Sequence, residues 1–147
     1  MMKRIHLIGI GGSGMSSIAR VLLEQGLTVS GSDRTLSPLA LNLRAAGAIV
    51  YEGHDPQHIE GVDMVVRSSA IADDNPEVAA ALALGIPVLK RQDFMRDLTR
   101  ERLCIAIAGS HGKTTTSTMM AWSLVQLGLD PGYILGGVSR NLANNAH

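Results

Sequence analysis

The stretch HLIGIGGSGMSSIA, residues 6–19, decides the fold class of this chain of 147 residues. An apolar run leads into Gly9-Ile10-Gly11-Gly12-Ser13-Gly14, which has the spacing G-x-G-x-x-G, and a helical pattern follows. Glycines permit a tight turn, and without Cβ atoms they let an anion approach the positive start of the next helix. The stretch therefore predicts a strand, a phosphate-binding turn and a helix.

Short β-type runs alternate with helical patterns through the first hundred residues. We expect strands at 4–9, 27–33, 48–53, 62–68 and 86–89. We expect helices over 14–25, from an N-cap at Ser37 to Gly47, from Asn75-Pro76-Glu77 to Gly85, and over the charged segment 91–100. Parallel neighbours need crossover connections, so this order predicts an α/β, Rossmann-like doubly wound parallel sheet over residues 1–100.

A second glycine loop lies in IAIAGSHGKTTTST, residues 105–118. The segment 109–115 is similar to a P-loop, although the strict pattern G-x-x-x-x-G-K-[ST] would need glycine in place of Ile107. In such a loop backbone N–H groups hold phosphates, Lys113 supplies positive charge, and a threonine hydroxyl can reach Mg²⁺.

The cycle of strand and helix restarts around this second loop. We expect a strand at 103–108, a helix at 113–127 and a further strand at 133–137. One helix and two strands do not close a core, so we interpret residues 101–147 as the truncated start of a P-loop ATPase α/β domain. We expect this part to be partly disordered or irregularly packed.

Composition excludes several classes of function. The formal net charge is zero and aromatic residues make up 3% of the chain, which argues against a nucleic-acid surface or a polybasic membrane patch. No apolar run approaches the length of a membrane helix, which is about 20 residues. The single cysteine, Cys104, excludes an internal disulfide and is expected to be a small buried hydrophobe. We expect a cytoplasmic protein.

The first glycine loop leaves its ligand open. Asp33 lies 19 residues after Gly14, where an acidic group can reach a ribose hydroxyl or instead cap a turn. NAD or FAD is the usual ligand of this fingerprint, but a nucleotide-sugar presents the same diphosphate. An NAD-dependent Rossmann oxidoreductase and a nucleotide-sugar-binding module are therefore alternatives. The second loop argues against the oxidoreductase, because a dehydrogenase has no use for Gly-Lys-Thr-Thr.

Taken together, the two loops resemble those of the Mur ligases, and most closely the alanine-adding branch of that family. The matching stretches are GIGGSGMS (9–16), VSGSD (29–33), SSAI (68–71), NPE (75–77), GIPVLKR (85–91), AGSHGKTTT (108–116), GG (136–137) and NNA (144–146). A branch that attaches a whole tripeptide to the same acceptor, in murein recycling, is the nearest alternative, and GIGGSGMSSIA is less similar to it.

The resemblance implies an ATP-dependent, ADP-forming carbon–nitrogen ligase of peptidoglycan precursor synthesis. Its first domain would bind UDP-N-acetylmuramate, its central domain ATP and Mg²⁺, and a third domain L-alanine. ATP would phosphorylate the lactyl carboxylate, and the amine of alanine would attack the acyl phosphate. A chain ending at residue 147 would then bind the UDP-sugar and be inactive alone.

The same resemblance assigns residues to two sites. UDP-N-acetylmuramate would bind at Gly11, Gly12, Ser13, Gly14, Met15, Ser16, Asp33, Arg34, Ser37, Ser68, Ser69, Ala70 and Ile71. ATP would bind at Gly109, Ser110, His111, Gly112, Lys113, Thr114 and Thr115. Lys113 would be the catalytic cation on the β- and γ-phosphates, and Thr114 or Thr115 would bind Mg²⁺. His54 and His58 lack a metal-ligand pattern and are expected to be structural or exposed.

Overall fold

The computed structural model describes residues 3–147. Its strands are β1 (Arg4–Ile8), β2 (Thr28–Asp33), β3 (Ile49–Glu52), β4 (Met64–Arg67) and β5 (Val88–Lys90). Its α-helices are α1 (Ser13–Glu24), α2 (Pro38–Ala45), α3 (Pro76–Ala83), α4 (Arg91–Thr99) and α5 (Lys113–Gln126), and one 3-10 helix, η1, spans Pro56–Ile59. Among the described residues no helix is long and apolar enough to cross a membrane.

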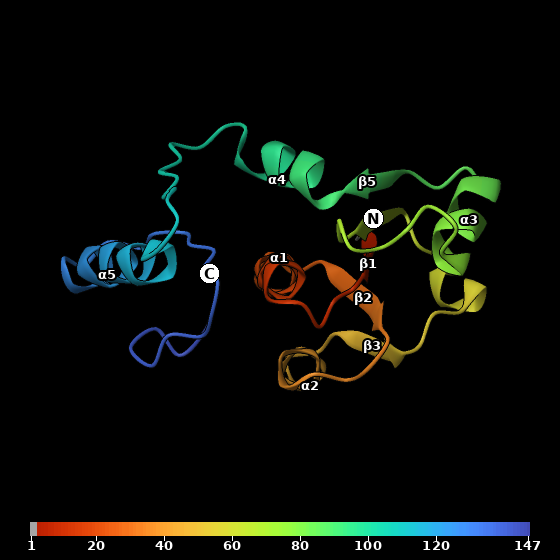
Figure 1. The fold of residues 1–147 in the computed structure, drawn as a ribbon, viewed down its shortest axis with the longest axis horizontal. Helices are drawn as coiled ribbons and strands as arrows, with labels where there is room; N and C mark the ends of the chain where they lie inside the picture. Colours follow the sequence, from red (N-terminus) through yellow and green to blue (C-terminus); the bar gives the residue numbers. More distant parts are fainter. Residues whose placement is uncertain (1–2) are drawn as a thin grey trace.

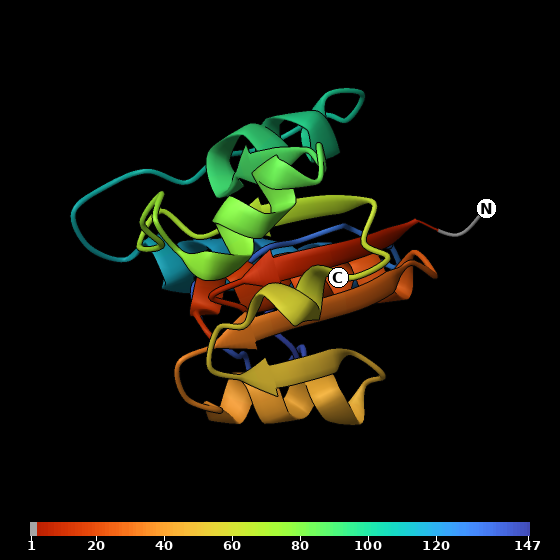
Figure 2. The ribbon, with the colours of Figure 1, turned by 90° about the vertical axis from the view of Figure 1, so that its right-hand side faces the viewer.

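The five strands form one parallel sheet in the order β3-β2-β1-β4-β5. Helices α1, α2 and α4 lie on one face of the sheet, and α3 and η1 lie on the other (Figures 1 and 2). The predicted α/β, doubly wound parallel sheet is confirmed. The strand order reverses between β1 and β4, and loops at the carboxyl ends of the two strands adjoin such a switch point.

Strand β1 is buried on both faces of the sheet. Ile5 and Leu7 pack in the cluster that includes α1, α2 and α4, whereas Ile8 packs with the cluster around η1 and α3. His6, between Ile5 and Leu7 in the strand, has none of its surface exposed. Burial on both faces explains why this strand is an almost continuous apolar run rather than an alternating one.

Two of the predicted helix starts carry side-chain caps, and the cap at Ser37 was itself predicted. The Ser37 hydroxyl accepts a hydrogen bond from Ala40 N at 3.2 Å, at the start of α2. The Asn75 side-chain oxygen accepts from Glu77 N and Val78 N at the start of α3. These caps depend on neighbours in the sequence, which is why local patterns find them.

The expected strand at 103–108 is wrong. This segment is an irregular, largely exposed connection, and Leu103 is 97% exposed. Cys104 is exposed rather than buried, so the interpretation of a buried thiol is also wrong. An apolar run becomes a strand only when a neighbouring strand pairs with it, and no described strand lies beside this one.

The expected strand at 133–137 forms only a single antiparallel bridge, between Ile134 and Ala146. Tyr133 and His147 exchange two backbone hydrogen bonds of 2.9 and 3.0 Å, and Leu135 N donates to Asn145 O at 2.8 Å. These bonds join residues 133–135 to residues 145–147, and we refer to the two segments as the C-terminal hairpin. Figure 1 shows this part of the chain between α5 and the sheet domain.

Gly31, in the interior of β2, lies close to β1 and to the first glycine loop. A Cβ atom on Gly31 would lie 2.5 Å from Leu7 O and 2.6 Å from Ile10 Cδ1. We expect Gly31→Ala to lower the free energy of unfolding by about 1–3 kcal/mol, because both the backbone at Leu7 and the side chain of Ile10 have to move. Urea denaturation measures the change.

Gly137→Ala is the control, since no atom lies within 4 Å of its added Cβ and its φ lies outside the left-handed region. We expect this control to change stability by less than about 0.5 kcal/mol. Equal losses in the two variants would contradict the packing argument.

Candidate functional site

The first glycine loop turns the chain from β1 into α1. Gly9 has φ +83°, in the left-handed region that favours glycine. The N–H groups of Gly9 and Ile10 both donate to Ser32 O, at 2.8 and 3.1 Å. Gly12 N donates back to Gly9 O at 3.2 Å. The turn is therefore attached to the end of β2 and closed on itself.

Asp33 and Ser37 hold the middle of this loop. Gly11 N donates to Asp33 Oδ2 at 2.8 Å, and the Ser37 hydroxyl donates to Gly11 O at 2.9 Å. The other oxygen of Asp33 accepts from Arg34 N at 2.8 Å. A Cβ on Gly11 would lie within 2.9 Å of both side chains. The structure thus gives Asp33 the turn-capping contact that was one of its two interpretations.

The start of α1 leaves its positive end open. Within the described chain, the N–H groups of Ser13, Gly14 and Met15 make no hydrogen bond. Gly12, the N-cap, supplies no side-chain acceptor, and the first turn carries no acidic residue. Free N–H groups at an uncapped helix start, together with the helix dipole, favour a bound anion.

Arg91, the first residue of α4, lies over the same turn. A Cβ on Gly14 would lie 2.7 Å from Arg91 Cζ and 2.8 Å from its Nε. Arg91 is exposed, and in residues 3–147 its guanidinium has no ion-pair or hydrogen-bond partner. The site therefore combines free backbone donors with an unpaired cation. The sequence analysis assigned no role to Arg91, because only the folded chain brings the start of α4 next to Gly14.

The loop after β4 forms the neighbouring wall of the site. Ser68 N donates to Ile8 O at 3.1 Å, and a Cβ on Gly9 would lie 3.1 Å from Ser68 Cβ. Arg67 fixes the far side of the loop through a hydrogen bond to Ile71 O. Residues 68–71 and the first glycine loop, which the sequence assigned to one site, are thus adjacent at the switch point of the sheet.

Two of the assigned residues point away from the loop. Met15 is 2% exposed and its side chain packs in the core, so it offers only its N–H. Ser16 is 1% exposed, its N–H donates to Gly12 O, and its hydroxyl donates to Ser13 O.

The second glycine loop has the same kind of open helix start. Gly112, the N-cap of α5, has φ +75°, and within the described residues neither a side-chain cap nor an acidic first-turn residue is present. The ammonium group of Lys113 donates to Gly109 O at 2.6 Å and to Ser110 O at 3.2 Å. The loop is exposed, and His111, Thr114 and Thr115 are exposed with it. The ammonium group of Lys113 therefore occupies the loop in which phosphates would bind.

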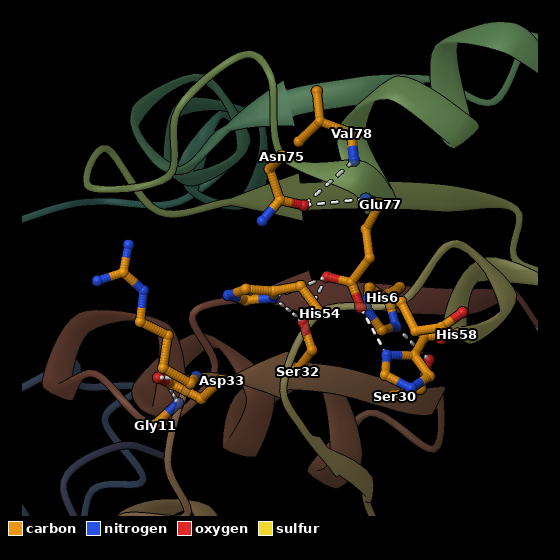
Figure 3. Close-up of polar contacts among 12 residues, drawn as sticks. His6, Gly11, Ser30, Ser32, Asp33, His54, His58, Asn75, Glu77 and Val78 are labelled. Atoms are coloured by element: carbon orange, nitrogen blue, oxygen red, sulfur yellow. Dashed lines mark hydrogen bonds and ion pairs between the residues drawn. The ribbon is translucent and has the colours of Figure 1, made fainter.

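A buried carboxylate lies on the face of the sheet that α3 and η1 cover (Figure 3). Glu77, in α3, is fully buried, and its Oε2 accepts from the Ser32 hydroxyl at 2.5 Å. His54 Nδ1 lies 3.1 Å from Oε2, and His58 Nδ1 lies 2.7 Å from Oε1. His6 Nε2 lies 3.5 Å from Oε1, longer than a regular hydrogen bond. The cluster joins α3 and η1 to the centre of the sheet.

The environment of Glu77 keeps it ionised. Burial by itself raises the pKa of this carboxyl, but the polar contacts with His6, Ser32 and His58 outweigh burial and hold the pKa at about 2. The ring of Tyr51 stacks on His58, with centroids 4.0 Å apart. Among the described residues no group of histidine, cysteine or acidic side chains has the geometry of a metal site. His54 and His58 thus serve the buried carboxylate.

Sequence reasoning noted Glu77 only as part of a helix start. One signal was available: within RIHLI, β1 places His6 among apolar residues. Buried polar groups need partners, so a histidine in a doubly buried strand implies polar residues around it. Ser30 Oγ lies 3.0 Å from His6 Nδ1, and Glu77 Oε1 lies 3.5 Å from His6 Nε2.

The fold and the first glycine loop define an α/β domain of the Rossmann-like class, with an anion-accepting turn at the switch point of its sheet. The chain belongs to the Mur ligase family. The family model described as "Mur ligase family, catalytic domain" matches residues 4–103, which include the whole sheet and α4.

Curated relatives match almost the whole chain. The UDP-N-acetylmuramate--L-alanine ligase of Persephonella marina is 50% identical over 144 residues, which cover 98% of this chain and 31% of the relative. The ligase of the same name from a Roseiflexus species is 48% identical over 141 residues, or 96% of this chain and 30% of the relative. The chain thus spans about a third of the length of these relatives.

Solved structures agree with the family. The UDP-N-acetylmuramate-alanine ligase of Thermotoga maritima superposes with a TM-score of 0.93 at 35% identity, covering 100% of this chain and 35% of that one. The UDP-N-acetylmuramate:L-alanyl-gamma-D-glutamyl-meso-diaminopimelate ligase of Neisseria superposes with a TM-score of 0.91 at 37% identity, covering 99% and 46%. The likeness extends over the C-terminal part of the chain as well as the sheet.

The Glu77 cluster predicts a specific loss of stability in acid. Unfolded Glu77 titrates near 4.5 and folded Glu77 near 2, so its stabilisation is complete above pH 4.5 and disappears as the pH falls from 4.5 to 2. Glu77→Gln should cost on the order of 3 kcal/mol at pH 7, because it removes the ionised carboxylate that the folded cluster stabilises. It should also flatten the decline between pH 4.5 and 2.

Urea unfolding at a series of pH values measures both effects. The other carboxylates are common to the two proteins, so their contributions cancel in the comparison. Parallel pH profiles of wild type and variant would show that Glu77 is not the titrating group.

Proposed function

We propose that this chain is the N-terminal part of an ATP-dependent ligase that joins L-alanine to the lactyl carboxylate of UDP-N-acetylmuramate, and that residues 1–100 bind the UDP-sugar. The observation that carries the proposal is the open start of α1, where three free N–H groups meet the unpaired guanidinium of Arg91. The identity of about 50% to enzymes named for this reaction supports the choice of acceptor and amino acid.

In this proposal the diphosphate of the acceptor lies on the N–H groups of Ser13, Gly14 and Met15. A dianionic group gains there from the helix dipole and from charge-assisted hydrogen bonds. Gly12 exposes backbone instead of a side chain, and Arg91 covers the outer side. Asp33 accepts the hydrogen bond from Gly11 N and thereby positions the loop. In addition, Asp33 and Arg34 would lie near the uridine end of the ligand.

Residues 101–147 begin the ATP-binding domain in this proposal. The open start of α5 offers backbone donors to phosphates, and Lys113 can exchange the carbonyls of Gly109 and Ser110 for phosphate oxygens. Thr114 or Thr115 would supply a hydroxyl to Mg²⁺. When bound, ATP supplies the phosphoryl group that makes the carboxylate reactive toward an amine. Within the chain, Lys113 neutralises charge beside that group.

A second candidate is the tripeptide-adding ligase that uses the same acceptor. The Neisseria enzyme, whose title names that activity, is 37% identical over nearly the whole chain. Both candidates require the same acceptor site at α1. The first glycine loop therefore supports the acceptor in either case. Comparing L-alanine with the tripeptide as the amine substrate of the complete enzyme distinguishes the two.

The acceptor assignment predicts the ligand selectivity of the chain. Calorimetric titration with UDP-N-acetylmuramate, UDP, NAD and NADP should give binding heat with the uridine compounds only. Gly12→Val should lower the affinity for UDP-N-acetylmuramate by at least about tenfold, because a side chain there meets the diphosphate. The added Cβ has room in the fold itself, with its nearest atom 3.5 Å away.

Gly137→Val is the control, since no atom lies within 4 Å of its added Cβ. It should keep the wild-type affinity, and thermal unfolding confirms that both variants fold. Binding of NAD without any response to UDP would favour the oxidoreductase instead.

Arg91 gives an independent test of where the diphosphate lies. Arg91→Ala should weaken binding of UDP by about tenfold or more, because a hydrogen bond to a charged group contributes about 1.5–3 kcal/mol. Arg96→Ala removes an exposed arginine from the same helix, so it should leave the affinity within about twofold. Equal effects of the two substitutions would place the diphosphate away from Arg91.

A further inference from the structure

The C-terminal hairpin is bound to α1 by a buried asparagine. Asn145 Nδ2 donates to Ser17 Oγ at 2.7 Å and also contacts Ser16 Oγ at 3.2 Å and Ser13 O at 3.4 Å. Asn145 is 4% exposed, and Ser16 and Ser17 are at most 1% exposed. These contacts join positions that are about 130 residues apart in the sequence.

The directions of these hydrogen bonds require an amide donor. The Ser16 and Ser17 hydroxyls both donate to Ser13 O, at 3.1 and 2.8 Å, so their oxygens are left as acceptors. The NH₂ group of Asn145 satisfies them. A carboxylate in the same place could not donate to Ser13 O, and the Ser16 and Ser17 hydroxyls would have to rotate away from Ser13 O to reach it. Its charge would also be buried, which is unfavourable.

The hairpin also contacts the second glycine loop. Leu135 N donates to Asn145 O at 2.8 Å, and the Ser17 hydroxyl lies 3.4 Å from Leu135 O. The next residue, Gly136, lies so close to α5 that a Cβ there would be 2.7 Å from Thr114 Oγ1. A continuous set of contacts therefore runs from the first turn of α1, through the hairpin, to the first turn of α5.

Little else fixes α5 in place. Only Ala121 of its residues is buried, and the connection from α4 is exposed and lacks regular structure over residues 103–112. At the far end of the hairpin, His147 lies 3.0 Å from Glu24 at the end of α1. The hairpin adds two buried apolar side chains, Leu135 and Ala146, to these polar contacts, so α5 depends on the hairpin for its place beside α1.

We propose that Asn145 is a positioning residue, which docks the C-terminal hairpin on α1 and thereby sets the second glycine loop relative to the first. The docking stands on the contacts alone, whereas its consequence for two phosphate-binding loops rests on the proposed function. The amide of Asn145 is used by Ser13 O, Ser16 Oγ and Ser17 Oγ, so in this proposal it acts on the arrangement of the loops.

Rotational motion of the ligand-free chain tests the docking directly. In wild type, ¹⁵N relaxation should give one correlation time for the amides of α1 and α5. Asn145→Asp should give α5 a shorter correlation time than α1, because the docking contact is lost. Asn141→Asp is the matched control, since Asn141 is exposed and belongs to the same segment, and it should keep the wild-type value. Independent tumbling in wild type, or a common value in Asn145→Asp, would overturn the proposal.

A second variant keeps the test decisive if Asn145→Asp fails to fold. Ser17→Ala removes the acceptor of the shortest contact from the α1 side, and it should release α5 in the same way. A common correlation time in Ser17→Ala would count against the docking role.

Affinity for UDP separates positioning from ligand contact. Asn145→Asp should bind UDP within about twofold of wild type, while Gly12→Val does not. A loss of UDP binding in Asn145→Asp as large as in Gly12→Val would overturn the positioning assignment. The relaxation experiment contains no ligand. It can therefore contradict the docking of the hairpin without affecting the acceptor assignment, and the UDP titration can contradict the acceptor assignment without affecting the docking.

Discussion

The hydrogen bond from Gly11 N to the Asp33 carboxylate holds the turn on which the first site depends. Together with the Ser37 hydroxyl on Gly11 O, it joins the end of β1 to the end of β2 and to the start of α2. The turn needs glycine at two positions: Gly9 has a positive φ, and Gly11 has no room for a Cβ beside Asp33 and Ser37. Since the loop is fixed from behind, the first turn of α1 presents its N–H groups outward.

Charge is handled in opposite ways on the two faces of the sheet. On the α1 side, the helix start has neither a cap nor an acidic residue, and Arg91 adds an unpaired cation, so the positive potential is left for a ligand. On the α3 side, Glu77 is buried and its oxygens are occupied by Ser32, His54 and His58. The paired carboxylate of Glu77 therefore stabilises the fold, whereas the uncapped start of α1 is available to bind an anion.

The accuracy of the sequence analysis follows the range of the interactions involved. The elements of the sheet domain were predicted closely, since buried parallel strands are apolar runs and the caps at Ser37 and Asn75 are local. The 3-10 helix η1 was missed, although Asp55 caps it by a local bond to Gln57 N. The strand at 103–108 was predicted wrongly, because hydrophobicity alone does not supply a pairing partner.

The site shows the same division. The glycine loop and the residues at 68–71 could be assigned from motif and resemblance, and the structure brings them together. Arg91 and Asn145 could not, because each reaches α1 from an element far away in the sequence. No local pattern records such an approach.

The sequence by itself determined the α/β class, the order of strands and α-helices in the sheet domain, and the two glycine loops, since all of these follow from periodicity and from the backbone freedom of glycine. Only the tertiary structure decided which side chains surround the loops. It placed Arg91 over Gly14, buried Glu77 among three histidines, and set Asn145 against α1. The reason is physical: hydrogen bonds and charge contacts act over a few ångströms of space, and the folded chain alone makes distant residues neighbours.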